Sequence, residues 1–184
     1  MAINLTKGQR VDVGLQRACV GLGWNPNDKA SAHAFDLDAS AFMLGESGKL
    51  VADEYFVFFN NPRSPEGSVE STGDNQSGEG EGDDETLKIN LSLVDTRVQE
   101  IIIVVTIHEA EKRKQNFGQV RNAFIRVYDA STKTEICKYE LDEDFSTESA
   151  VEFGRLYRRG EQWKFEALGR GHTGGLEALL LKYG

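Results

Sequence analysis

The feature that most constrains the fold is the run EIIIVVTIH at residues 100–108, in which apolar and mostly β-branched side chains follow one another. Such side chains pack well on a pleated surface and lose rotamer freedom in a helix. A strand that is apolar on both faces is typical of the centre of a covered sheet. The run EYFVFFN at 54–60 has the same character, so we predict two central strands.

Residues 34–44, AFDLDASAFML, alternate between apolar and polar positions as a half-buried strand does. The apolar face holds Phe35, Leu37, Ala39, Ala41 and Met43, and the polar face holds Asp36, Asp38 and Ser40. Further short strands are expected at 18–24, 85–91, 122–129, 134–141, 149–159 and 162–171, with turn residues between them. Only GGLEALLLKYG at 174–184 has helical spacing.

These patterns predict a mainly β fold, a two-sheet antiparallel β-sandwich with a short C-terminal helix and long acidic loops. The chain of 184 residues is large enough for one continuous hydrophobic core. Its predicted strands are spaced too evenly to mark a boundary. We therefore expect residues 1–184 to form a single domain.

The balance of charge narrows the classes of partner. The chain has 30 acidic and 21 basic side chains, which gives a net charge of −9. A field of that sign repels phosphate backbones and anionic lipids, and the basic runs are short and interleaved with acids, so we expect no nucleic-acid partner. The chain begins with no charged and apolar leader, and no apolar run reaches the roughly 18 residues of a membrane span. We expect a cytoplasmic protein without direct membrane insertion.

The segment GDNQSGEGEGDDE at 73–85 holds six carboxylates and four glycines, with no Lys or Arg. A phosphate cradle is excluded, because these charges would repel the phosphate. A flexible acidic linker stays open as an interpretation, because it needs charge and little else. The third interpretation is a Ca²⁺ site, since Ca²⁺ takes oxygen ligands from carboxylates, amides and main-chain carbonyls, and glycine lets the backbone fold tightly around it.

A second set of carboxylates favours the Ca²⁺ site. Asp36 and Asp38 lie two positions apart on a predicted strand, so they project from one face with Cα atoms about 7 Å apart. Their segment opens like an EF-hand loop, but Ala41 and Ser47 stand where that loop needs Gly and Glu, so it is not one. We expect the end loops of a sandwich to converge, with bound Ca²⁺ offsetting the repulsion between the two sets.

Other arrangements of reactive residues give weaker signals. In IHEAEK at 107–112, Lys112 replaces the second His of a zinc-protease motif, so that interpretation fails, while Glu109 remains a candidate cation ligand. No Ser-His-Asp or Cys-His arrangement can be identified, and a metal-dependent phosphoesterase would need a general base and a substrate-positioning Arg that we do not find. We therefore expect a protein that is not an enzyme. Cys19 and Cys137 both neighbour apolar residues, which predicts buried free thiols.

Several long stretches together resemble one known family. These are VGLGWNP, FDLDASAFML, FVFFNNPRSPEGSVESTGDNQSGEGEGDDE, QNFGQVRNAFIRV and ELDEDFSTESAVEFGRLYRRGEQWKFEALGRG, and the resemblance covers nearly the whole chain. They look like the TerD/TerE tellurium-resistance and stress-protein family, related to the calcium-binding proteins of bacterial chemical stress. The resemblance implies a β-sandwich with clustered acidic Ca²⁺ sites and a role in resistance to tellurite, other chemical stresses or phage.

The resemblance also implies a set of ligands and partners. Its cation-binding acids would be Asp36, Asp38, Asp74, Glu79, Glu81, Asp83 and Asp84, with Asn60, Asn61 and Asn75 assisting. Glu109 stands where the family commonly has Asp, so its longer side chain would have to reach the ion. The implied cofactor is Ca²⁺, and the implied partners are other tellurium-resistance and stress proteins, with peripheral association at the inner membrane through them.

Together these inferences predict a calcium-binding, non-enzymatic stress-response protein whose acid-rich loops bind Ca²⁺ and organise a protein-interaction surface. The alternative is a metal-independent acidic scaffold that contacts other proteins of the resistance system directly. Equal binding of a partner in EDTA and in Ca²⁺ would favour the alternative.

Overall fold

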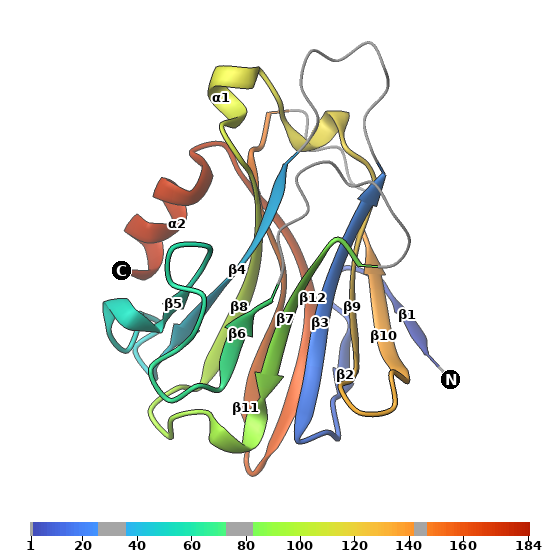
Figure 1. Cartoon of the computed structure of the whole chain (residues 1–184), viewed down its shortest axis with the longest axis vertical. Helices are drawn as coiled ribbons and strands as arrows, with labels where there is room; N and C mark the ends of the chain where they lie inside the picture. Colours follow the sequence, from blue (N-terminus) through green and yellow to red (C-terminus); the bar gives the residue numbers. More distant parts are fainter. Residues whose placement is uncertain (1, 26–35, 73–82, 142–146) are drawn as a thin grey trace.

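Two β-sheets pack face to face in the computed structural model, which describes residues 2–25, 36–72, 83–141 and 147–184 (Figure 1). Sheet A has the strand order β1-β10-β9-β3-β7-β6, and sheet B has the order β2-β12-β11-β8-β4-β5. The strands are β1 (Ile3–Leu5), β2 (Arg10–Asp12), β3 (Arg17–Asn25), β4 (Leu37–Leu44), β5 (Phe56–Val57), β6 (Val69–Ser71), β7 (Glu85–Asn90), β8 (Glu100–Ile107), β9 (Arg121–Asp129), β10 (Glu135–Glu140), β11 (Ala150–Arg159) and β12 (Gln162–His172). All these pairings are antiparallel except that of β1 with β10. The predicted mainly β, two-sheet fold is confirmed.

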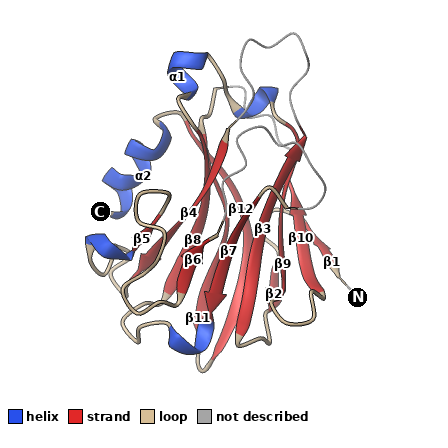
Figure 2. Ribbon diagram, in the orientation of Figure 1, coloured by secondary structure: helices blue, strands red, loops and turns tan. Residues whose placement is uncertain are grey.

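Helical segments are short in the described part of the chain, and they lie outside the two sheets (Figure 2). They are α1 (Ala110–Arg113), α2 (Gly175–Tyr183) and the 3-10 turns η1 (Asp53–Tyr55), η2 (Leu91–Leu93) and η3 (Phe117–Gln119). The C-terminal helix was predicted, and α2 confirms it. The predominantly polar stretch 109–120, where no helix was predicted, contains α1 and η3. No helix in the described residues is long and apolar enough to cross a membrane.

The alternation expected at 34–44 is confirmed along β4. Leu37, Ala39, Ala41 and Met43 point into the main core between the sheets. Phe35 lies outside the described residues. The opposite face of β4 is polar only at its start, because its later residues Phe42 and Leu44 are buried on the outer face of sheet B.

The run at 100–108 forms β8, which lies in the middle of sheet B between β11 and β4. One face of β8 packs into the main core, and Ile102 and Val104 on the other face belong to a second apolar cluster with Leu179 and Tyr183 of α2. The amphipathic C-terminal helix therefore covers the outer face of sheet B, and the predicted central strand is confirmed.

The prediction of a second central strand at 54–60 is wrong. The segment begins in η1, continues as the two-residue β5 at the edge of sheet B, and then turns. The side-chain amide of Asn61 donates hydrogen bonds to the carbonyls of Glu54 (3.0 Å) and Phe56 (2.8 Å), which closes the segment on itself. Tyr55 and Phe56 are buried, Phe56 stacks on Phe58 with ring centroids 4.5 Å apart, and Phe59 is exposed, so the segment is not covered by sheets on both sides.

A close approach within sheet B requires a glycine at 154. A Cβ there would lie 2.3 Å from the ring of Phe165 and 3.0 Å from the carbonyl oxygen of Glu166, and Phe165 is buried in the core. We expect Gly154→Ala to lower the free energy of unfolding by about 1 to 3 kcal/mol through overpacking. Urea denaturation measures the change. Gly45→Ala is the matched control, because its Cβ would meet nothing nearer than 3.4 Å; equal stability of the two variants would contradict the expectation.

Both cysteines are free and buried, as the sequence predicted. Burial raises the pKa of the Cys137 thiol to about 12, so only about one molecule in 10⁴ carries that thiolate at pH 8, and the thiolate is the reactive form. We expect the native protein to react slowly with a thiol-specific disulfide reagent at pH 8. In the urea-unfolded protein, both thiols should react and be counted by the absorbance of the released reagent anion. Rapid reaction of the folded protein would contradict this.

Candidate functional site

One end of the sandwich brings together segments that are far apart in the sequence. β4 and β7 begin at this end and β8 ends there, from both sheets (Figure 1). The backbone N–H of His108, just after β8, donates to the carbonyl of Asp36 at 2.8 Å. Of the eleven predicted site residues, Asp36, Asp38, Asn60, Asn61, Asp83, Asp84 and Glu109 are described. Asp74, Asn75, Glu79 and Glu81 lie outside the described residues.

Glu85 joins the end of the acidic segment to the Asp36–Asp38 segment. Its carboxylate oxygen Oε2 accepts a hydrogen bond from the backbone N–H of Ala39 at 3.2 Å, so sheet A reaches across to sheet B. β5 pairs only with Ala41 and Phe42 of β4, so a side chain has to satisfy the N–H of Ala39. Glu85 was not among the predicted site residues. The sequence does hold a pattern that marks it, because Glu85 shares the buried face of β7 with Leu87 and Ile89 at a period of two.

Asp84 caps the end of a strand in sheet A. Its Oδ2 accepts from the backbone N–H of Trp24 at 3.0 Å, beyond the last pairing of β3 with β7. Burial raises the pKa of the Asp84 carboxyl above its ordinary value, and the hydrogen bond from Trp24 opposes that shift. This environment therefore disfavours the ionised form of Asp84, and a cation beside the carboxylate would stabilise that form.

Asp83 points to the outer face of sheet A, where it meets Arg126 of β9. The guanidinium donates to both carboxylate oxygens, at 2.8 and 2.9 Å, and the Asp83 side chain is only 7% exposed. The absence of a side chain at Gly21 makes room for this carboxylate, since a Cβ there would overlap it. Arg126 also stacks on the ring of Tyr128 at 4.6 Å. Any cation bound by Asp83 would have to share it with this ion pair.

Asp36 and Asp38 stand at the start of β4, where the sequence placed them. Asp36 is buried at the rim, and Asp38 lies beside Thr106 of β8, its partner in the sheet register. Asp38 faces the outer side of sheet B, opposite to Leu37 and Ala39, which point into the main core. The two aspartates are therefore at the same end of the sandwich as Asp84 and Glu85.

Glu109 and the two asparagines have local partners. Glu109 has a φ of 51° just before α1, and its carboxylate lies 3.4 Å from the Nζ of Lys112 and 3.5 Å from the Nε of Arg113. Lys112 is the main cause of the lowered pKa of Glu109. Asn61 holds the turn after β5 with its amide, and Asn60 is exposed in that turn. The structure does not place Asn60 or Asn61 in contact with the aspartates.

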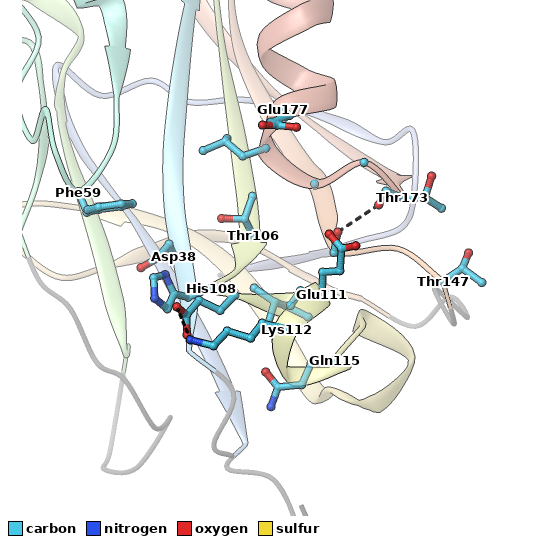
Figure 3. A pocket seen from close by; sticks show the side chains of 17 residues that line it. Asp38, Phe59, Thr106, His108, Glu111, Lys112, Gln115, Thr147, Thr173 and Glu177 are labelled. Atoms are coloured by element: carbon cyan, nitrogen blue, oxygen red, sulfur yellow. Dashed lines mark hydrogen bonds and ion pairs between the residues drawn. The ribbon is translucent and has the colours of Figure 1, made fainter. Parts of the chain in front are cut away.

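A groove of about 1040 Å³ opens beside the start of β4, on the outer face of sheet B (Figure 3). Asp38 and Thr106 lie between Phe59 on one side and Glu177 of α2 on the other, and Glu109, Glu111 and Lys112 line the end formed by α1. Two predicted cation ligands, Asp38 and Glu109, therefore line the same groove.

The described residues alone do not complete a metal centre. Within residues 2–25, 36–72, 83–141 and 147–184, no group of three or more His, Cys, Asp and Glu side chains is close enough together to hold an ion. The carboxylates present are hard oxygen donors, which suits Ca²⁺ and does not suit thiolate-binding metals. The rest of the predicted ligand set falls in 73–82.

Comparisons with known proteins identify the family. The family model described as the TerD domain matches residues 1–183. The chain belongs to the TerD domain family. General stress protein 16U of Bacillus subtilis (strain 168) and tellurium resistance protein TerD of Serratia marcescens are each 48% identical to it, over 100% of this chain and 98% of the relative.

A solved structure supports the fold independently. The crystal structure of a homologue of telluride resistance protein (TerD) from Streptomyces coelicolor A3(2) has a TM-score of 0.70 and 22% identity, covering 91% of this chain and 96% of the other. The TerD family resemblance drawn from the sequence is confirmed. The family therefore includes relatives named for general stress and for tellurium resistance.

Proposed function

We propose that this TerD family protein is a calcium-binding, non-enzymatic stress-response protein whose acidic rim binds Ca²⁺ and organises a surface for other stress and resistance proteins. The observation that carries the proposal is the hydrogen bond from the N–H of Ala39 to Glu85. It holds the end of the acidic segment 73–85 against the segment that carries Asp36 and Asp38. Carboxylates separated by more than 40 residues in sequence therefore share one rim.

The electrostatic balance supports a cation at this rim. The chain has a net charge of −9, and Asp36, Asp38, Asp84 and Glu85 lie at the same end of the sandwich. Like charges brought together raise one another's pKa and destabilise the fold. A divalent ion would reverse the sign of that interaction and link the two sheets through their loops. Asp36, Asp38 and Asp84 would contribute ligands together with residues of 73–82, since the described carboxylates alone do not complete a site.

We do not propose that this protein reacts directly with tellurite. Tellurite is an oxyanion, and its reduction would need reactive thiols, whereas Cys19 and Cys137 are both buried. The negative field of the chain also disfavours an anionic substrate. We propose that the contribution to resistance is made through contacts with other proteins.

Thermal denaturation tests the proposal. At a free Ca²⁺ concentration of about 100 times Kd, each bound ion should stabilise the fold by about 2.7 kcal/mol, or about 5 to 10 °C in Tm for a chain of this size. Asp36→Asn with Asp38→Asn should remove most of the rise. The control is Glu161→Gln, an exposed carboxylate in the β11–β12 turn. A Tm that is the same in EDTA and in Ca²⁺ would sink the proposal.

A metal-independent acidic scaffold is the second candidate, and the ion pairs favour it. Asp83 is held by Arg126, and Glu109 by Lys112 and Arg113, so two predicted ligands already neutralise cationic side chains of the same chain. A basic partner protein could be recognised by the remaining carboxylates in the same way. Partner binding that is equal in EDTA and in Ca²⁺ would support this candidate over the first.

A further inference from the structure

The groove on the outer face of sheet B combines a concave shape with an exposed aromatic wall. Its volume of about 1040 Å³ is at the upper end of the range for ligand sites and suits a stretch of polypeptide. Phe59 on one wall is 59% exposed, so its ring is open to a ligand in the groove. Leu176 in the first turn of α2 lies on the opposite side and packs against the apolar cluster beneath the helix.

Phe59 is held in place by the aromatic residues that precede it. Its ring lies 5.3 Å from that of Phe58, which stacks on Phe56 at 4.5 Å, and Phe56 in turn contacts the buried Phe42 at 4.4 Å. A series of ring contacts therefore runs from the core beneath α2 to the exposed wall of the groove. A rigid aromatic side chain supplies contact area at a low cost in conformational entropy.

The lining of the groove is negatively charged. Four carboxylates, from Asp38, Glu109, Glu111 and Glu177, line it together with one ammonium group, that of Lys112. That ammonium already lies 3.4 Å from Glu109. A cation above an exposed aromatic ring is attracted by the ring quadrupole, and surrounding carboxylates strengthen the attraction. The same lining would repel a second copy of this chain, whose net charge is −9.

We propose that this groove docks a basic segment of a partner protein, with an Arg or Lys side chain over Phe59 and an apolar neighbour against Leu176. The proposal rests on the proposed function for the idea that the rim contacts other proteins, and it names the surface and the chemistry of the partner. The contacts come from Phe59, Leu176 and the groove carboxylates, so docking does not require a bound ion.

Fluorescence anisotropy with labelled peptides tests the docking. The probe is a peptide of three Arg-Leu repeats, compared with three Glu-Leu repeats and three Arg-Ser repeats, in EDTA and again in Ca²⁺. We expect the Arg-Leu peptide to bind at least tenfold more tightly than either control, with an affinity that falls as salt rises. Absence of binding, or equal binding of the three peptides, would overturn the proposal.

Matched variants locate the binding. Phe59→Ala and Glu177→Lys should each weaken the Arg-Leu peptide at least tenfold. Leu93→Ala removes an equally exposed apolar side chain (53% exposed) in η2, and Glu161→Lys changes an exposed carboxylate in the β11–β12 turn; both should leave affinity within twofold. All four positions are at the surface, so Tm should stay close to that of the unsubstituted protein. Equal losses in test and control variants would mean attraction by net charge alone and would overturn the proposal.

Two further measurements distinguish docking of a basic partner from dimerisation and from Ca²⁺ binding. Sedimentation of the free protein shows whether a second copy occupies the groove: conversion of a dimer to a monomer by Phe59→Ala would overturn the proposal. The Ca²⁺-dependent rise in Tm should be unchanged in Phe59→Ala. If Phe59→Ala loses peptide binding and keeps the Ca²⁺-dependent rise in Tm, the result supports docking in the groove. If the unsubstituted protein binds the peptide but its Tm does not change with Ca²⁺, the result contradicts only the proposed function.

Discussion

Replacing Glu152 by alanine is expected to lower the free energy of unfolding by about 3 to 5 kcal/mol, because it removes a fully buried side chain with its hydrogen bond from Tyr183 and leaves a cavity. Glu152 of β11 is fully buried beneath α2. Its Oε1 accepts from the Tyr183 hydroxyl and lies 3.1 Å from the Nζ of Lys182, while His172 and Arg170 approach Oε2 at 3.7 and 3.9 Å. The variant leaves the Tyr183 hydroxyl buried without this acceptor and removes the contact of Glu152 with Lys182 at the end of α2.

Urea denaturation with a graded series measures this effect. Tyr183→Phe removes one donor and keeps the carboxylate, so its cost should be smaller, about 1 to 3 kcal/mol. Burial and Glu152 together raise the pKa of the Tyr183 hydroxyl, so it remains a donor across the range in which the protein is folded. Glu161→Ala, an exposed carboxylate, should change stability by less than about 0.5 kcal/mol. A Glu152→Ala protein as stable as this control would contradict the role assigned to the cluster.

Replacing Arg126 by leucine is expected to cost about 3 kcal/mol, because it leaves the nearly buried Asp83 carboxylate without its bidentate partner. Asp83→Asn added to Arg126→Leu should recover part of that loss, since no buried charge then remains. The coupling energy from the two single variants and the double variant isolates the pair. Additive effects would show that Asp83 and Arg126 do not stabilise each other.

The same variant tests whether Asp83 is a cation ligand. Arg126→Leu releases both carboxylate oxygens that the guanidinium holds at 2.8 and 2.9 Å. If Asp83 also faces the ion, the Ca²⁺-dependent rise in Tm should be larger in Arg126→Leu than in the unsubstituted protein. An unchanged rise would assign Asp83 to the ion pair alone and remove it from the predicted ligand set.

The sequence predicts the fold well where a periodic pattern is long. The first half of β4 alternates between apolar and polar residues, and β8 is apolar except at Glu100 and Thr106, so burial on one face or both could be inferred directly. The run at 54–60 misled because aromatic side chains can be buried by stacking on one another as well as by a covering sheet. The side chain of Asn61, which folds that segment into a turn, gives no signal in hydrophobic periodicity.

The candidate site could be predicted only in part, for a different reason. Residue types and spacing selected Asp36, Asp38 and the acidic segment, and the structure places the start of β4 and the start of β7 at one end of the sandwich. Which partner each carboxylate takes depends on contacts between distant strands. The pairing of Asp83 with Arg126 spans 43 residues and that of Glu85 with Ala39 spans 46, so neither could be read from local pattern.

The position of the groove suggests how ion binding and partner binding relate. Asp38 belongs to the predicted ligand set and also lines the groove with Phe59. An ion at the rim would lower the negative charge of the groove, which weakens the binding of a basic partner. If the ion instead fixes the groove in its binding conformation, the affinity for that partner increases. The affinity of the peptide in EDTA and in Ca²⁺ gives the sign of the coupling between the two ligands. By linkage, the peptide must change the affinity for Ca²⁺ by the same factor.

Isothermal titration calorimetry of the chelator-treated protein with Ca²⁺, followed by Mg²⁺, tests the proposed cation binding most directly. We expect saturable heat with Ca²⁺ and at least about tenfold weaker binding of Mg²⁺, which requires a stricter octahedron and gives up water reluctantly. Asp36→Asn with Asp38→Asn should remove most of the Ca²⁺ heat while the protein stays folded. A folded, unsubstituted protein that gives no saturable heat with Ca²⁺ would contradict the proposal.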